Sequence, residues 1–218
     1  KFAYVANQGA NNVSAFTIES TTGALTSVAG SPFATGTAPR AVAVDQNERW
    51  AYVPNQADNT VSAFMIDGVS GALTVVGSPV PVGTTPVSAT VDPSGRFAYV
   101  ANQGANTVSA FTIDGATGAL TPALGSPVVT GTAPRFVSVD PSGRWAYVAN
   151  SWSNNISVFT INRLTGGLTA VVGSPFAAGL TPISVTVDPN GQVAYVANSG
   201  ANTVSAFAIN NITGALTP

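Results

Sequence analysis

Short apolar runs of about five to eight residues alternate with turn-forming residues along the whole chain. One run reads FAYVAN or WAYVAN, with small variations, and the same type recurs at Phe2, Trp50, Phe97, Trp145 and Val193. Runs of this length that are rich in Val, Ala, Thr, Phe and Tyr are typical of β-strands. No stretch has the apolar spacing of an amphipathic helix. The pattern therefore predicts an all-β protein.

The starting points of these runs give a repeat of 47 or 48 residues. Each repeat contains, in order, a proline-led run, the AYV run, a VSAF run and a GALT run, which we call strands a, b, c and d. The segments between them contain residues that favour tight turns. DPSG or DPNG follows strand a in three repeats, and a glycine recurs at the same position before each strand d. The spacing therefore predicts four antiparallel strands in each repeat.

Strand b is apolar on both faces, as in the run Phe97, Ala98, Tyr99, Val100 and Ala101. A sheet with one face in water would alternate apolar and polar residues instead. Four-stranded sheets that recur every 40 to 50 residues and are covered on both faces are the blades of a β-propeller. The small residues of strand a indicate that this strand lies innermost, beside the axis; they are Ala43, Thr90, Ser138 and Thr186.

The repeats divide residues 1–218 into one β-propeller domain of about five blades. We expect a partial blade with strands b, c and d over 1–36, full blades over 37–83, 84–131 and 132–179, and a blade with a truncated outer strand over 180–218. The first blade has no inner strand of its own. An unpaired strand edge invites pairing, so we expect a larger ring, or one completed by another molecule through self-association.

Composition excludes several kinds of partner. Only 7% of the residues are charged and the net charge is −2, so a nucleic-acid backbone has no basic surface to bind. No apolar run approaches the roughly 20 residues that span a bilayer, which excludes membrane insertion as a helix. The low lysine content with abundant Thr and Asn favours an extracellular or cell-surface protein.

The chain contains no cysteine and no histidine. Histidine is the commonest general base and metal ligand near neutral pH, and the nine acidic residues are dispersed along the chain. We therefore expect no metal and no cofactor, and the composition favours a protein that is not an enzyme.

Candidate ligand-binding residues are those at which one repeat departs from the others. Strand a begins with Arg40 and Arg135 where the other two copies have Val87 and Ile183. Such arginines can bind a carboxylate or phosphate, or lie in solvent over the ring entrance. Trp152 replaces the glycine or alanine of the other b–c loops, and it can stack on a sugar or pack on a neighbouring loop. The same loops carry the remaining candidates, Gln8, Gln56, Gln103 and Asp58.

Two polar positions recur in the repeats and have a structural interpretation. An asparagine ends strand b and an aspartate ends strand a, and both are expected to hydrogen-bond to loop backbone. The asparagines are Asn7, Asn55, Asn102, Asn150 and Asn198, and the aspartates are Asp45, Asp92, Asp140 and Asp188.

The motifs AYVAN and GALTP, repeated through the whole chain, resemble those of the YVTN-repeat and lactonase-like β-propellers. That family includes bacterial phosphogluconolactonases and bacterial or archaeal surface proteins. The resemblance implies a propeller that acts on sugar lactones. The catalytic set expected in such enzymes contains histidine, which this chain lacks, so no catalytic residue is transferred.

Three functions follow as hypotheses. The first is a non-catalytic surface scaffold that binds a carbohydrate, a small acid or a protein where the d–a and b–c loops form the propeller mouth. The alternative is a hydrolase of sugar lactones, in which Asp58 near an arginine would activate water. The second alternative is a structural propeller unit that assembles with itself.

Overall fold

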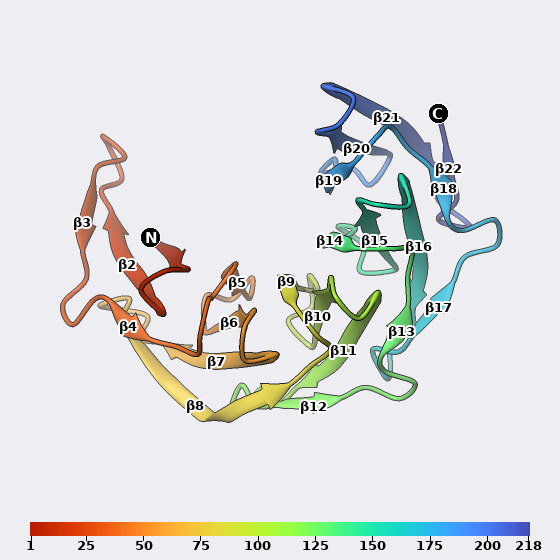
Figure 1. Cartoon of the computed structure of the whole chain (residues 1–218). Coiled ribbons are helices and arrows are strands. Elements are labelled where there is room, and N and C mark those ends of the chain that lie inside the picture. Colours follow the sequence, from red (N-terminus) through yellow and green to blue (C-terminus); the bar gives the residue numbers. More distant parts are fainter.

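The computed structural model describes residues 1–218 and contains strands but no helix. Five antiparallel sheets are arranged radially around a common axis, and together they form an arc with the two chain ends at its two extremities (Figure 1). The predicted all-β propeller of four-stranded blades is confirmed. We number the sheets as blades 1 to 5 in chain order.

The strands keep the predicted order from the axis outward (Figure 1). The inner strands are β5 (Ala43–Val44), β9 (Pro86–Val91), β14 (Pro134–Val139) and β19 (Pro182–Val187). The second strands are β1 (Phe2–Asn7), β6 (Trp50–Asn55), β10 (Phe97–Asn102), β15 (Trp145–Asn150) and β20 (Val193–Asn198). The third strands are β2 (Asn12–Ile18), β7 (Thr60–Ile66), β11 (Thr107–Ile113), β16 (Asn155–Ile161) and β21 (Thr203–Ile209).

The outer strand differs from the single run that the sequence predicts. In blades 1, 3 and 4 it is split into two short strands that pair with opposite ends of the third strand. The chain leaves the sheet between them, as at Gly125, which has a φ of 81°. Blade 2 instead has one long, bulged outer strand. The outer strands are β3 (Leu25–Ser27), β4 (Phe33–Ala34), β8 (Leu73–Pro81), β12 (Leu120–Pro122), β13 (Val128–Val129), β17 (Leu168–Ala170), β18 (Phe176–Ala177) and β22 (Leu216–Thr217).

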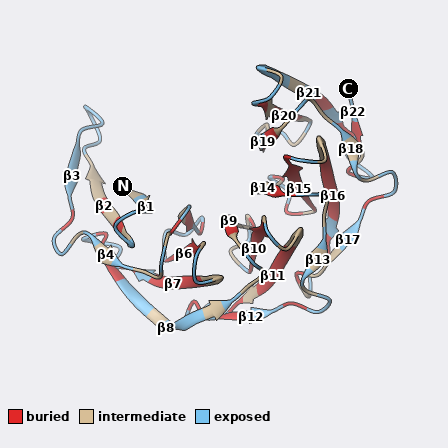
Figure 2. Ribbon diagram, viewed as in Figure 1, coloured by how far each residue is buried: buried red, intermediate tan, exposed pale blue.

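The hydrophobic core lies in the seams between neighbouring blades (Figure 2). Strand β10 contributes to two seams at once: Tyr99 and Ala101 pack toward blade 4, and Ala98 and Val100 pack toward blade 2. This explains why strand b is apolar on both faces. The same positions at the end of the arc lack a neighbour, so Tyr195 is 44% exposed whereas Tyr99 is fully buried. One blade therefore buries its apolar residues only against another blade.

At each seam the first aromatic ring of strand b lies against the glycine of the next c–d turn, and at the first three seams the strand-b tyrosine hydroxyl also bonds to that glycine. The ring of Trp50 lies against Gly118, where a Cβ would overlap it, and Phe97 lies against Gly166 in the same way. The Tyr52 hydroxyl donates a hydrogen bond to the Gly118 carbonyl at 3.0 Å. Burial, and then the negative charge of Asp45, raise the pKa of Tyr52. The glycine is required because it combines a φ of 73° at residue 118 with the close ring.

We expect Tyr99→Phe to lower the free energy of unfolding by about 1 kcal/mol, because it removes the bond from the Tyr99 hydroxyl to the Gly166 carbonyl at 3.1 Å. Tyr147→Phe is the matched control. The Tyr147 hydroxyl is buried without a hydrogen-bond partner, so its removal should leave the urea midpoint unchanged or slightly higher. Equal losses in the two variants would contradict this assignment.

Candidate functional site

The d–a and b–c loops of each blade lie together on one face of the propeller, which we call the mouth face. They are joined by backbone hydrogen bonds, such as those from Gln103 N to Thr85 O at 2.9 Å and from Ser151 N to Ala133 O at 2.9 Å. The preceding blade also holds each d–a loop, because Asn106 Oδ1 accepts a bond from Ala133 N at 2.8 Å. The residue before each strand-a proline adopts a left-handed conformation, with a φ of 55° at Ala133. Backbone contacts on both sides therefore position the start of each inner strand.

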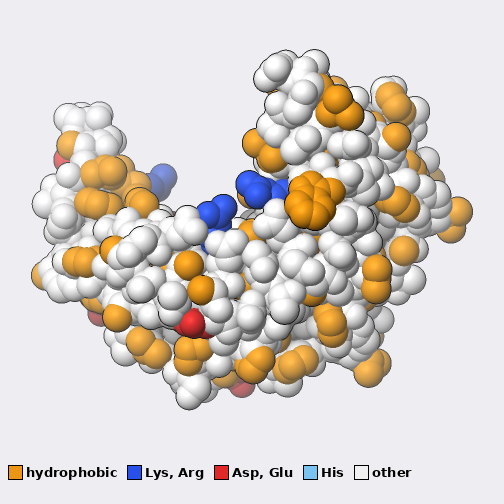
Figure 3. Space-filling view, in the orientation of Figure 1, with side chains coloured by type: hydrophobic (Ala, Val, Ile, Leu, Met, Phe, Trp, Pro, Cys, Tyr) orange, Lys and Arg blue, Asp and Glu red, His pale blue; other side chains and the backbone are white.

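Arg40 and Arg135 occupy this start in blades 2 and 4. The Arg40 Nη1 atom donates to Gln8 Oε1 at 2.7 Å, and Gln8 Nε2 lies 3.4 Å from Gln56 Oε1. The structure therefore brings three of the predicted ligand residues into one chain of hydrogen bonds across blades 1 and 2. Arg135 is half-buried at the start of β14. Figure 3 shows Arg side chains at the inner margin of the arc, near β5 and β14.

Trp152 projects from the b–c loop of blade 4 and is 75% exposed. Its loop has room for a large side chain because the facing d–a residue is Ala133. In blade 3 the equivalent pair is Gly104 and Thr85, and a Cβ on Gly104 would come within 2.8 Å of Thr85 Oγ1. The exposed indole and the arginine thus belong to the same blade, and their loops are bonded to each other through Trp152 N and Thr132 O at 3.2 Å.

Asp58, in the b–c loop of blade 2, supports the neighbouring d–a loop. Its Oδ2 atom accepts a hydrogen bond from Thr37 N at 2.6 Å, and Ser153 Oγ accepts the equivalent bond from Thr132 N in blade 4 at 3.0 Å. The hydrogen bond of Arg40 goes to Gln8 rather than to Asp58. Gln103 is half-buried and is bonded to the d–a loop through its backbone.

The recurring asparagines have different partners from those that we expected. Asn102 Nδ2 donates to Thr107 Oγ1 at 3.1 Å and to Ser109 Oγ at 2.9 Å, so it binds side chains of the third strand rather than loop backbone. The reason is register, because Asn102 pairs directly with Thr107 across the sheet. The recurring aspartates do bind backbone: Asp92 Oδ1 accepts bonds from the N–H groups of Arg96 and Phe97 at 2.9 and 2.8 Å.

No three acidic side chains gather into a group that could hold a metal ion. The structure also contains no helix long and apolar enough to cross a membrane. The chemistry that the mouth face offers is that of guanidinium groups, amides and an exposed indole.

Four-stranded antiparallel blades arranged radially around a common axis define a β-propeller. The sequence profile of the family described as "Lactonase, 7-bladed beta-propeller" matches residues 1–90 and 86–177. The chain belongs to this family. Its own residues form five of the blades that the family description counts as seven. No curated protein matches the chain.

Several solved structures share the fold. A candidate 6-phosphogluconolactonase from Bacteroides fragilis has a TM-score of 0.85 at 22% identity, over 98% of this chain and 65% of its own. One from Bacteroides uniformis has a TM-score of 0.84 at 19% identity, over 98% and 68%. The periplasmic gluconolactonase of Pseudomonas aeruginosa has a TM-score of 0.78 at 18% identity, over 95% and 62%. The chain therefore spans about two thirds of the length of these proteins.

Proposed function

We propose that this protein binds lactones of sugar acids at its mouth face and promotes their hydrolysis, with Arg40 and Arg135 as the binding residues. Membership of the lactonase family supports this hypothesis over the non-catalytic scaffold that composition favoured. One observation carries the proposal: two blades place an arginine at the same inner-strand position on the mouth face, and the hydrogen bond of Arg40 goes to an amide, not to a carboxylate.

The reaction adds water across the ring ester. The water oxygen bonds to the carbonyl carbon, the ring C–O bond breaks, and the proton of the water passes to the leaving ring oxygen. Negative charge develops on the carbonyl oxygen before the ring opens. A guanidinium group stays protonated at any working pH and can donate two parallel hydrogen bonds to such an oxygen, or to a phosphate or carboxylate.

This assignment makes electrostatic stabilisation of the developing oxyanion the main contribution of the two arginines. The chain has no histidine to act as a base. The only acid of the mouth loops is Asp58, whose Oδ2 atom is already bonded to Thr37 N. We therefore propose that Asp58 stabilises the d–a loop and does not activate water.

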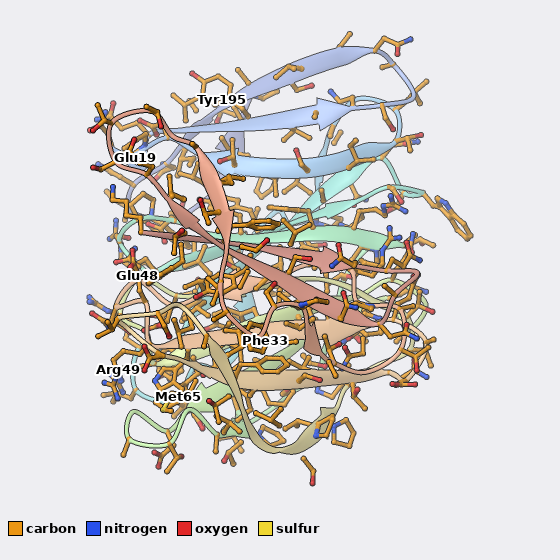
Figure 4. The ribbon with its side chains drawn as sticks, turned by 90° about the vertical axis from the view of Figure 1, so that its left-hand side faces the viewer. Glu19, Phe33, Glu48, Arg49, Met65 and Tyr195 are labelled. Atoms are coloured by element: carbon orange, nitrogen blue, oxygen red, sulfur yellow. The ribbon has the colours of Figure 1, made fainter.

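The test compares hydrolysis of gluconolactone and of its 6-phosphate by the wild-type protein, by Arg40→Gln and by Arg135→Gln. We expect each substitution to lower kcat/KM by about tenfold or more, since each removes a donor aimed at developing charge. Arg49→Gln is the control, because Arg49 lies on the opposite side of the blades (Figure 4) and its guanidinium bonds to Gly115 O. An unchanged kcat/KM in the double variant Arg40→Gln/Arg135→Gln would refute the assignment.

A second candidate function is a binding module without catalysis, and the 75% exposed side chain of Trp152 favours it. An exposed indole beside an arginine-bearing loop is suited to stacking on a sugar ring. Binding of gluconate that weakens in Trp152→Ala, together with no turnover of either lactone, would favour this function over hydrolysis. A location outside the cytoplasm accords with the single lysine of the chain, and we include it in the proposal.

A further inference from the structure

The opposite side of the propeller, formed by the a–b and c–d turns, has its own row of arginines. Arg49, Arg96 and Arg144 each precede the first aromatic residue of strand b and lie over its ring, at 5.3, 5.1 and 4.0 Å from the ring centroid respectively. We call this side the turn face. Figure 4 shows Arg49 at its edge, together with Glu48 and Glu19.

Two of these arginines bridge a seam. Arg49 Nη2 donates to the carbonyl of Gly115 in blade 3 at 2.6 Å. Arg144 Nη2 donates in the same way to the carbonyl of Asn211 in blade 5 at 2.8 Å. The partner is at the same position of the c–d turn in both cases, so these two seams share one type of bridge.

The seam between blades 3 and 4 is different. The c–d turn of blade 4 carries Arg163 where the turns of blades 3 and 5 carry Gly115 and Asn211. Arg96 does not bridge to this turn. Instead, Arg96 and Arg163 both line a cavity of about 240 Å³. Its other lining residues are Asp92, Pro93, Ser94, Phe97, Ser142 and Gly143.

The cavity is lined by two guanidinium groups and by one carboxylate, that of Asp92, which already accepts hydrogen bonds from the protein. Asp92 is 3% exposed, and it accepts bonds from Ser94 N, Ser94 Oγ, Arg96 N and Phe97 N at 2.5 to 3.0 Å. The Ser142 hydroxyl is likewise bonded to Asp140 and to Arg144 Nε. The free donors of the cavity are therefore the two guanidinium groups, which are available to an anion.

We propose that this cavity is a binding site for a phosphate group, held between the guanidinium groups of Arg96 and Arg163. Planar guanidinium groups bind phosphate oxygens in pairs, which gives both strength and orientation. A water molecule takes about 30 Å³ in the liquid, so the cavity has room for a phosphate with several waters, or for the phosphate of a small ester. The site lies on the turn face and is independent of the proposed lactone site on the mouth face.

The experiment is titration calorimetry of inorganic phosphate at low ionic strength, where attraction between charges is least screened. The starting protein is Arg40→Gln/Arg135→Gln, so that the mouth arginines cannot bind the probe. We expect saturable binding of one phosphate per chain, weakened at least tenfold when Arg163→Asn or Arg96→Gln is added. Asparagine is the residue of blade 5 at this turn position, so the turn accommodates it.

Arg49→Gln in the same background is the matched control, and it should leave the affinity unchanged because Arg49 lies outside the cavity. A second titration with glycerol phosphate distinguishes a free phosphate ligand from an ester, which would bind more tightly. Absence of saturable binding, or an affinity that Arg163→Asn leaves unchanged, would overturn the site. Neither result bears on lactone hydrolysis, because the background variant already lacks the mouth arginines.

Discussion

Gly118→Ala is expected to lower the free energy of unfolding by about 2–4 kcal/mol. Gly118 lies in the c–d turn of blade 3 with a φ of 73°, and an added Cβ would overlap the Trp50 ring of blade 2. The substitution therefore combines backbone strain with overpacking at the seam. Because Trp50 is 5% exposed and belongs to the core cluster between blades 2 and 3, we expect that its ring cannot move aside without opening the seam.

Gly23→Ala is the control that separates these two effects. Gly23 has the same TGAL context and a φ of 74°, but an added Cβ would meet nothing within 4 Å. We expect it to cost about 1 kcal/mol, the contribution of the left-handed backbone alone. Chemical denaturation of both variants measures the difference. If the two variants were equally destabilised, the contact between ring and glycine would not be what holds the seam.

Asp140→Ala is expected to lower the free energy of unfolding by about 3–5 kcal/mol. Asp140 is 1% exposed and its carboxylate closes the a–b turn of blade 4. Its Oδ1 atom accepts bonds from Arg144 N and Trp145 N, both at 2.7 Å, and its Oδ2 atom accepts one from Ser142 N at 3.0 Å. Alanine would leave these donors without a partner in a place that water reaches poorly, and thermal or urea denaturation would report the loss.

Asp188 makes the equivalent bonds in blade 5, to Val193 N and Gln192 N at 2.7 and 2.6 Å, but it is half-buried. Asp188→Ala should therefore cost clearly less than Asp140→Ala. The bond from Val193 N is the first cause that lowers the pKa of Asp188 from its ordinary value of 3.8. A lowered pKa means that this aspartate stabilises the fold above about pH 4 and that its contribution disappears as the pH falls through the lowered value. A larger loss in Asp188→Ala than in Asp140→Ala would contradict the role of burial.

The blades and the sorting of loops onto two faces could be predicted from the sequence, because each depends on residues close together in one repeat. The apolar run from Phe97 to Ala101 already indicated two covered faces, and the period indicated the radial arrangement. The split outer strand could not be predicted in this way. Gly125 and its neighbours leave the sheet in blade 3, whereas blade 2 continues through the same region as one long strand.

Part of the candidate site could be predicted from the sequence, and part depends on contacts made only in the folded protein. Arg40, Arg135 and Trp152 were found because each breaks the pattern of its own repeat. The bond from Arg40 to Gln8 and the support of the d–a loop by Asp58 depend on which atoms meet after folding. The cavity at Arg96 and Arg163 was missed entirely, because its two cations are 67 positions apart and belong to different blades. An alignment of the repeats could have indicated it, because Arg163 stands at a c–d turn position where blades 3 and 5 have Gly115 and Asn211.

The interlock between strand-b aromatics and turn glycines also gives the array a direction. At the first three seams the earlier blade presents its ring and its tyrosine hydroxyl to the turn glycine of the blade that follows, and at the last seam the ring of Trp145 alone lies against Gly214. A duplicated blade can be inserted between two others only in the same orientation. In that orientation its ring contacts the turn glycine of the following blade, and its own turn glycine contacts the ring of the preceding blade. Growth of such a protein by duplication therefore requires no new interface, and sequence change remains free to accumulate in the loops.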